Sequence, residues 1–320
     1  MWGESLSGRR IVVTGGCGFI GGHLVDYLLR LPGTQVVVID DGRFGHHVVP
    51  DSKDRYSLIR HRLGPDSLET LRECLRPNDI VFHLAAEKLH QSHDDRAALL
   101  NSNVHGTWRV LEAAARACAA RVIVASSLYA HGRMSGPPLR EDDLPQPATV
   151  YGVTKLAGEH LLQAARHTTG LKGLALRFFF VYGPRQYGGT GYRSVIVKNF
   201  QRLLDGKRPT ICGDGAQALD YIYIQDVVCA LVLAAESQLD GDVLNIGSGR
   251  AVSILELTGL MQKVAGTELS PEFIAEDFTA GSHREADTVR ARQKLGFKAE
   301  VSLEEGLAST WSWLKKEGSA

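Results

Sequence analysis

The chain has 320 residues, of which 44% are apolar and 22% are charged. These proportions are ordinary for a globular protein and exclude disorder, collagen and coiled coil as the main architecture. Thirty-six basic residues balance thirty-six acidic ones, so no excess of charge favours nucleic acid or an anionic membrane as a partner.

In chain order, short apolar segments alternate with amphipathic ones through the first half. The pattern predicts strands at 10–14, 35–39, 79–84, 121–125 and 173–178, and helices at 21–31, 68–75, 97–119 and 151–167. Continuous, β-branched strands that alternate with helices are typical of a parallel sheet covered on both faces. Right-handed crossovers then give an α/β fold with a Rossmann-type doubly wound sheet.

The rhythm changes in the second half. Residues 183–190 are rich in Gly, Pro and Tyr and are expected to form a loop, followed by helices near 194–205, 226–237, 253–265, 288–295 and 303–316. We therefore expect a Rossmann domain over residues 1–178. A smaller lobe that binds the substrate, over residues 179–320, is expected to be partly interleaved with it.

The cysteine pattern and the hydropathy of the chain point to a cytoplasmic protein. The five cysteines are odd in number and form no C-x-x-C pair, which argues against a disulfide framework or a thiolate zinc site. The first ten residues have no apolar core of signal-peptide length. No apolar run reaches the roughly 18 residues that a membrane span needs.

A glycine-rich loop follows the first predicted strand. Gly15, Gly18 and Gly21 give the spacing G-x-x-G-x-x-G at a junction of strand and helix. Glycines there allow a tight turn, the approach of a pyrophosphate to the backbone, and close packing of helix on strand. Asp40 ends the second strand, where the adenosine ribose hydroxyls of a dinucleotide lie. A carboxylate repels a 2′-phosphate, so NAD is favoured over NADP.

Three further residues form a candidate catalytic set. Tyr151 and Lys155 open a long predicted helix, and their i, i+4 spacing puts both side chains on one face. A nearby ammonium lowers the pKa of a phenol, so that Tyr151 acts as a base near neutral pH. Ser127 follows the strand 121–125 at the carboxyl edge of the sheet, where such folds bind ligands. Its hydroxyl would bridge Tyr151 and a substrate oxygen.

With these features, several motifs run along nearly the whole chain: residues 14–21, 82–86, 103–107, Tyr151 with Lys155, 177–184, 213–215, 226–228 and 244–247. Together they resemble the extended short-chain dehydrogenase/reductase family, in its NAD-dependent epimerase/dehydratase branch. The resemblance implies bound NAD, a nucleotide-sugar substrate, and a homodimer formed through the helices 97–119 and 151–167. Lys155 would also touch the nicotinamide ribose.

The resemblance extends to the residues around both ligands. Those expected near NAD are Gly15, Gly18, Phe19, Ile20, Gly21, Asp40, Asp41, Leu84, Ala85, Ala86, Lys88, Asn103, Ser126, Tyr151, Lys155 and Phe178. Those expected near the substrate are Lys88, His90, Tyr129, Phe180, Arg185, Gln186, Arg193 and Arg284. His131 is a further candidate to face the sugar, and residues 185–187 begin a candidate lid.

Two departures bear on the reaction. In 4,6-dehydratases of the family, the hydroxyl residue is followed by Asp-Glu, which supply acid and base for the loss of water. Leu128 and Tyr129 stand there instead, so dehydration is not expected and epimerisation, at the sugar 4-hydroxyl, remains. The alternatives are a net sugar oxidoreductase and an atypical dehydratase. A third alternative, a non-catalytic protein that senses NAD, is disfavoured because Ser127, Tyr151 and Lys155 are all present.

Other departures lie on the substrate side. Leu219 replaces the Arg that would grip the diphosphate, Phe180 replaces an Asn, and residues 280–283 hold no second phosphate Arg. Arg284 or Arg193 would then substitute, and the substrate is an unusual nucleotide sugar or not a nucleotide sugar. Leu63 also stands where an Asp would meet the adenine amino group.

A metal site is not expected. Glu87, His90, His93 and Asp94 gather four polar groups within eight residues, but they match no catalytic-zinc spacing. Their position in a loop that enters a helix explains them as loop and capping residues.

Overall fold

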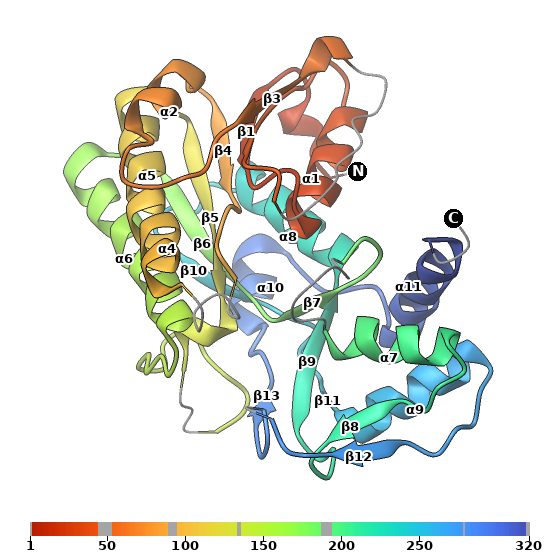
Figure 1. The fold of residues 1–320 in the computed structure, drawn as a ribbon. Coiled ribbons are helices and arrows are strands. Elements are labelled where there is room, and N and C mark those ends of the chain that lie inside the picture. The colour runs from red at the N-terminus through yellow and green to blue at the C-terminus, as the bar shows by residue number, and fades with distance from the viewer. Residues whose placement is uncertain are drawn as a thin grey trace.

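The computed structural model describes residues 2–43, 53–88, 95–132, 136–186, 194–277 and 279–317. A seven-stranded parallel sheet forms the larger part of the molecule, and Figure 1 shows it flanked by helices above a smaller lobe. The sheet order is β10-β6-β5-β4-β1-β2-β3. Its strands are β1 Arg10–Thr14, β2 Gln35–Asp40, β3 Tyr56–Arg60, β4 Ile80–His83, β5 Arg121–Ser127, β6 Gly173–Phe178 and β10 Val243–Ile246.

All five strands expected from the sequence are present, each within two residues of its predicted bounds. The predicted α/β fold with a Rossmann-type sheet is thereby confirmed. Two strands were not predicted. β3 is an edge strand whose side chains are all at least partly exposed, so it lacks the continuous apolar run of a buried strand.

Helices cover the two faces of the sheet. α1 Phe19–Arg30, α8 Ile224–Glu236 and α10 Val289–Leu295 pack together on one face. α2 Leu68–Cys74, α5 Thr107–Arg116 and α6 Val150–Thr169 pack on the other. Successive residues of a strand point to opposite faces. Ile11 and Val13 of β1 accordingly belong to the core under α1 and α8, and Val12 belongs to the core under α5 and α6.

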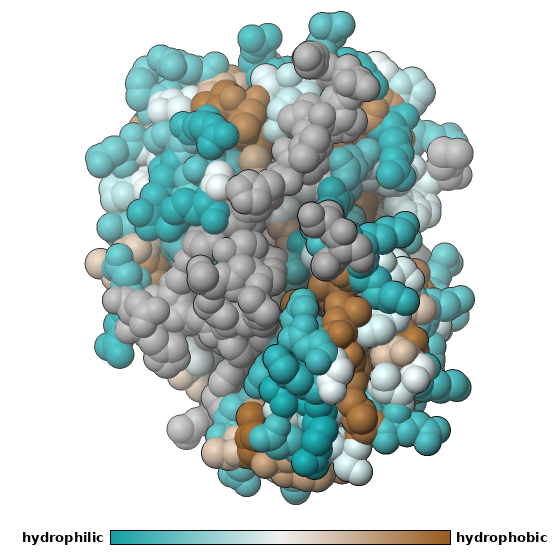
Figure 2. All heavy atoms as spheres, turned by 45° about the vertical axis from the view of Figure 1, so that its right-hand side comes forward, coloured by the Kyte–Doolittle hydropathy of each residue, from teal (hydrophilic) through white to brown (hydrophobic). Residues whose placement is uncertain are grey.

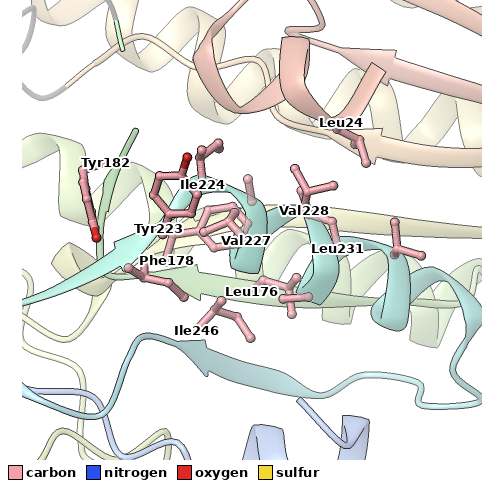
Figure 3. Packing of buried hydrophobic residues seen from close by; sticks show 14 of the residues in the cluster. Leu24, Leu176, Phe178, Tyr182, Tyr223, Ile224, Val227, Val228, Leu231 and Ile246 are labelled. Carbon is pink, nitrogen blue, oxygen red and sulfur yellow. The ribbon is translucent and has the colours of Figure 1, made fainter. Parts of the chain in front are cut away.

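The two halves of the chain share one of these cores. In Figure 3, Leu24 of α1 faces Val228 and Leu231 of α8, with Leu176 of β6 and Ile246 of β10 on the sheet beside them. Because β10, α8 and α10 follow residue 179, part of the second half completes the Rossmann sheet.

The predicted helix 97–119 consists of three pieces. α4 Arg96–Leu100 leads into a π-helical segment, η3 Asn101–Gly106, which continues as α5. The helix ends at Arg116, three residues earlier than predicted, and Cys118 just beyond it has a φ of 55°. A left-handed residue stops an α-helix. π-helical turns often occur at functional sites, and η3 carries Asn103, described below.

The smaller lobe is built on short strands. β7 Phe180–Tyr182, β9 Ala218–Tyr223, β11 Ala251–Ser253 and β13 His283–Arg284 form one sheet, and β8 Thr210–Cys212 pairs with β12 Glu272–Ile274. The predicted helices of this lobe are confirmed as α7 Val195–Leu204, α9 Ile254–Ala265 and α11 Leu303–Glu317. Most of these strands have only two or three residues, which leaves too little pattern for prediction, and in the longer β9 the buried Asp220 interrupts the apolar run.

The surface is mainly hydrophilic where it is seen. Among the coloured residues of Figure 2, hydrophilic ones predominate, and hydrophobic residues gather in a narrow strip in the lower part of the view and in a smaller group near its top. In the described parts of the chain, no helix combines the length and apolarity needed to cross a membrane.

Candidate active site

A cleft of about 520 Å³ runs along the carboxyl ends of the central strands and continues onto the smaller lobe. Its first end is lined by the glycine loop after β1 and by Asp40, and its far end by residues such as Lys198 and Tyr221. The strand order reverses between β1 and β4. Ligands of doubly wound sheets bind at this kind of position.

The glycine loop is packed so closely that two of its glycines have no room for a side chain. Gly15 has a φ of 75°, and a Cβ there would lie 2.6 Å from the amide nitrogen of Ala85. A Cβ on Gly21 would lie 2.1 Å from the carbonyl oxygen of Gly15. The loop therefore turns directly into α1, and its backbone N–H groups and the helix N-terminus suit a pyrophosphate.

Asp40 is held in place at the end of β2. Its carboxylate accepts hydrogen bonds from the amides of Cys17, at 3.0 Å, and Gly42, at 2.7 Å. Each carboxylate oxygen keeps a further acceptor site, which suits ribose hydroxyls. Asp41, beside it, forms an ion pair of 2.6 Å with Arg43. A 2′-phosphate would meet two carboxylates at this end of the cleft.

Glu87 connects this end of the cleft to the catalytic helix. Its buried carboxylate pairs with Arg43 and, at 3.0 Å, with Arg62. Its backbone amide donates to the Asn103 Oδ1 at 2.7 Å, and the Asn103 Nδ2 donates to the Glu87 carbonyl and the Thr154 Oγ1. Asn103 was expected to contact NAD. In the structure it is not among the residues that line the cleft, and its amide is engaged by Glu87 and by Thr154 of α6.

Tyr151, Ser127 and Lys155 come together at the middle of the cleft. Thr149 caps α6 by accepting a hydrogen bond of 3.0 Å from the Gly152 amide, which puts Tyr151 in the first turn. The Tyr151 hydroxyl hydrogen-bonds Ser127, the last residue of β5. One turn later, the Lys155 ammonium lies 5.7 Å from the centre of the Tyr151 ring and donates to the Ala125 carbonyl at 2.9 Å.

Burial dominates the ionisation of this set. It raises the pKa of Tyr151 to about 12, although the hydrogen bond from Ser127 acts in the opposite direction. It also lowers the pKa of Lys155 to about 8, against the pull of Glu159. The prediction that the pKa of Tyr151 falls below its ordinary value is wrong for this structure, because desolvation of the phenolate outweighs the hydrogen bond from Ser127.

A buried histidine supports the same region. His83, at the end of β4, hydrogen-bonds Thr14 at 2.8 Å through Nδ1 and Thr107 at 2.9 Å through Nε2. Burial, together with the charge of Lys155, lowers its pKa to about 3. His83 is therefore neutral at pH 7 and joins β1, β4 and α5 beneath the glycine loop.

Tyr129 forms the wall of the cleft next to Tyr151. The two rings meet edge to face, with centroids 5.9 Å apart. The guanidinium of Arg284 lies 5.1 Å from the centre of the Tyr129 ring and hydrogen-bonds its hydroxyl. Burial raises the pKa of Tyr129, and Arg284 partly offsets this. Both residues were expected near the substrate.

The far end of the cleft contains residues that the sequence did not single out. Lys198 of α7, Gln217, Tyr221 of β9 and Asp277 line it together with Leu219 and Phe180. No local motif marks these positions, because they converge from separate elements of the smaller lobe.

The expected lid residues divide between the cleft and α1. Gln186 lines the cleft, and its amide is fixed by the Val181 carbonyl and the Ser194 hydroxyl. Arg185 was expected to touch the substrate. Instead it forms an ion pair of 2.7 Å with Asp26 of α1, so it does not line the cleft.

Most of the expected ligand residues line the cleft. They are Gly15, Gly18, Phe19, Ile20, Gly21, Asp40, Asp41, Leu84, Ala85, Ala86, Lys88, Ser126, Ser127, Tyr129, Tyr151, Lys155, Phe178, Phe180 and Gln186. His131 is buried behind it against Asn245. His90, Tyr187, Arg193, His93 and Asp94 lie outside the described residues, and no metal-binding group is found among those that are described.

The comparison with protein families decides the identity of this cleft. The model of the "NAD dependent epimerase/dehydratase family" matches residues 11–247. The chain belongs to this family. The cradle of the glycine loop, the paired acids at 40 and 41 and the size of the cleft fit its cofactor, which is NAD.

Full-length relatives of this epimerase/dehydratase include both reaction types. A UDP-glucose 4-epimerase from Mycolicibacterium smegmatis is 33% identical over 313 residues, covering 96% of this chain and 99% of that protein. A dTDP-glucose 4,6-dehydratase from Streptomyces griseus is 31% identical over 322 residues, covering 97% and 95%. Among solved structures, MoeE5 in complex with UDP-glucuronic acid and NAD is 36% identical with a TM-score of 0.84, covering 96% and 99%.

Proposed function

We propose that the chain is an NAD-dependent 4-epimerase of a nucleotide-activated sugar. The observation that carries the proposal is the grouping of Tyr151, Ser127 and Lys155 at the carboxyl edge of the sheet, in one cleft with the glycine loop. The set can move a proton to and from a substrate hydroxyl. The chemistry that NAD supplies when bound is reversible hydride transfer.

Tyr151 is the group that exchanges a proton with the sugar 4-hydroxyl. Its pKa of about 12 keeps it protonated in the resting cleft at neutral pH, so its conversion to a base needs positive charge nearby. Lys155, with a pKa of about 8, supplies an ammonium 5.7 Å from the ring at neutral pH. Ser127 orients the substrate oxygen toward Tyr151. Loss of that proton, together with transfer of the C4 hydride to bound NAD, would give a 4-keto sugar; after the sugar turns over in the cleft, the same hydride would return to its other face and Tyr151 would return the proton.

The wall beside Tyr151 favours epimerisation over dehydration. Loss of water from a 4-keto sugar needs a base for the C5 proton and an acid for the leaving hydroxyl. Leu128 and Tyr129 follow Ser127. The acids lining the described cleft are Asp40 and Asp41 at the cofactor end, Glu87 in its two ion pairs, and Asp277 at the far end. None of them contacts Tyr151.

The cleft and the relatives together support a nucleotide sugar as substrate. UDP-glucose is the substrate in the name of the Mycolicibacterium relative, and UDP-glucuronic acid is bound in the MoeE5 structure. In this chain, Leu219 and Phe180 offer the diphosphate no charge, and Lys198 is a cation that lines the far end. We therefore propose that Lys198 takes part of the phosphate contact.

A label at the reacting carbon tests this function. We expect a UDP-sugar deuterated at C4 to give the 4-epimer with the label retained, because the hydride taken from the substrate returns to it. Tyr151→Phe serves as the catalytic control. Release of reduced cofactor in an amount equal to the sugar consumed would identify a net oxidoreductase. Formation of a 4-keto-6-deoxy sugar would identify a dehydratase. NAD binding without turnover of any nucleotide sugar would identify a sensing protein.

We also propose a homodimer formed through the helix α4–η3–α5 and α6. Leu100 of α4 and Val153 of α6 are large apolar side chains, 42% and 48% exposed, on helices that contact each other. An interface would bury them. Light scattering at micromolar concentration is expected to give a dimer that Val153→Glu converts to monomer. A wild-type monomer at that concentration would contradict the proposal.

A further inference from the structure

Arg284 is not itself among the residues that line the cleft, but it lies beside two that are, Tyr129 and Leu219, on an element that has no place in the cofactor site. It lies in β13, which pairs with β9 in parallel register so that Arg284 stands opposite Leu219. Paired residues of neighbouring strands project from the same face of a sheet. Leu219 lines the cleft, so Arg284 projects from the same face, one strand away, and its guanidinium lies over the Tyr129 ring.

The guanidinium of Arg284 keeps hydrogen-bonding capacity that the described protein does not use. One contact goes to the Tyr129 hydroxyl. The Nη1 atom is buried and has no hydrogen-bond partner among the described residues, and no described carboxylate forms an ion pair with the side chain. Buried donors are almost always paired in native proteins. An unpaired guanidinium donor beside Tyr129, a residue of the cleft wall, can be engaged by a ligand acceptor that enters next to that ring.

The position of Arg284 places that acceptor on the sugar. The reacting hydroxyl lies at Tyr151, and Tyr129 with its guanidinium neighbour is the next side chain along the wall, 5.9 Å away between ring centres. The cation at the far end of the cleft is Lys198, on a different element. Lys198 and Arg284 would therefore contact different parts of one substrate, with Arg284 beside the sugar ring.

We propose that Arg284 and Tyr129 form a subsite for a carboxylate carried by the sugar, so that the preferred substrate is a nucleotide-activated uronic acid. Guanidinium and carboxylate match in geometry and form charge-assisted, often bidentate hydrogen bonds. The Tyr129 hydroxyl supplies a third contact. A neutral sugar would leave the Arg284 donor buried and unpaired, which is how a polar site rejects a substrate that lacks the matching group. This inference rests on the proposed function for the identity of the reacting sugar.

Binding and turnover of three ligands test the subsite. For the wild type we expect kcat/KM to be at least tenfold higher for UDP-glucuronic acid than for UDP-glucose. Arg284→Gln should lower the value for UDP-glucuronic acid about tenfold to a hundredfold, the range of a hydrogen bond to a charged group. UDP-glucose should change less than threefold, and the Kd of UDP alone should stay unchanged. Arg284→Lys keeps the charge but not the guanidinium geometry, so its kcat/KM for UDP-glucuronic acid should lie between those of the wild type and Arg284→Gln.

Arg290→Gln is the matched control. It removes a guanidinium from α10 that pairs with Glu141 and Asp142 outside the cleft lining, and the preference should survive. Melting temperature and NAD content show whether each variant folds. If Arg284→Gln weakened all three ligands equally, Arg284 would contact the diphosphate and the proposal would be overturned. If the variant kept the wild-type preference for UDP-glucuronic acid over UDP-glucose, Arg284 would only hold Tyr129 in place, and the proposal would also be overturned. Because Kd needs no turnover, an Arg284-dependent preference without any epimer would refute the 4-epimerase alone.

Discussion

The cofactor end and the substrate end of the cleft are built in different ways. The cofactor end consists of short continuous segments: the glycine loop after β1, Asp40 at the end of β2 and residues 84–88 after β4. The substrate end gathers single residues from α7, from β9 and from the segment that contains Asp277 and Thr279. The cofactor end binds a dinucleotide mainly through backbone groups, so residues that are neighbours in the sequence can form it. The substrate end binds a sugar through side chains of separate elements, so it forms only when the smaller lobe packs.

Tyr151 lies where the two ends meet, and its removal is expected to have the largest effect. Tyr151→Phe keeps the ring that packs edge-on against Tyr129 and removes the hydroxyl that exchanges the proton. Turnover should fall by about a hundredfold or more, the scale of general acid–base catalysis, while NAD remains bound. Steady-state kinetics and the cofactor content of the purified variant measure both. Substantial activity in a variant that retains its full content of NAD would show that another residue exchanges the proton with the substrate. Tyr151 would then not be the catalytic residue at which the two ends of the cleft meet.

Asp40 tests the cofactor end alone. Its carboxylate accepts two backbone amides and faces the adenosine side of the cleft beside Asp41. We expect NAD to bind at least tenfold more tightly than NADP, because the 2′-phosphate would meet these negative charges. Asp40→Asn should narrow the ratio, and Asp54→Asn, at an exposed acid outside the cleft lining, should leave it unchanged. Equal affinity of the wild type for both dinucleotides would assign Asp40 a purely structural role.

The fold was predictable where pattern and burial agree. Strand β1 is apolar throughout its interior, and β6 is interrupted only by the buried Arg177, which pairs with Glu159. Both were located within a residue or two, because burial on both faces requires a nearly continuous apolar run. The edge strand β3 was missed because none of its side chains is fully buried. Most strands of the smaller lobe were missed because two or three residues show no pattern, and β9 because the buried Asp220 interrupts its apolar run. The three-part helix from α4 to α5 was predicted as one, since a π-helical segment such as η3 has no signature in hydrophobic spacing.

The site was predictable to the same extent. Tyr151, Lys155 and the glycines follow spacings that one helix or one turn enforces, whereas Lys198 and Asp277 meet only after the smaller lobe folds. Asn103 and Arg185 show the opposite case. Both belong to recognisable motifs, but tertiary partners engage them: Glu87 and Thr154 bind the Asn103 amide, and Asp26 binds the Arg185 guanidinium. The direction of the pKa shift of Tyr151 could not be predicted from the sequence either, because it is set by the burial of the side chain.

His83 makes the cofactor end sensitive to acid. Its pKa is about 3 when folded and about 6.5 when exposed, so the unfolded chain binds the extra proton first. The free energy of unfolding should fall as the pH drops from about 6.5 toward about 3, by about 1.4 kcal/mol per pH unit from this residue. In urea denaturation, His83→Gln should show a shallower pH slope than the wild type. His160→Gln, at an exposed position of α6, should keep the wild-type slope; equal slopes in all three would exclude His83 as the cause.

Lys198 tests the substrate end, where the smallest effect is expected. The residue lines the cleft from α7, but its side chain is exposed, and an ammonium in contact with water contributes less than about 1 kcal/mol to an ionic contact. Lys198→Met should therefore weaken binding of UDP and of UDP-sugars alike by about threefold to fivefold.

The effect of Lys198→Met should shrink as salt is added, because exposed charges are screened. Titration calorimetry at low and at 0.5 M salt gives both quantities. Lys207→Met removes an exposed charge outside the cleft lining, paired at 3.3 Å with Asp205, and should leave affinity unchanged. A loss of a hundredfold or more in Lys198→Met would mean that one exposed side chain carries the phosphate contact. The substrate end would then depend on a single dominant residue, contrary to the distributed site described above.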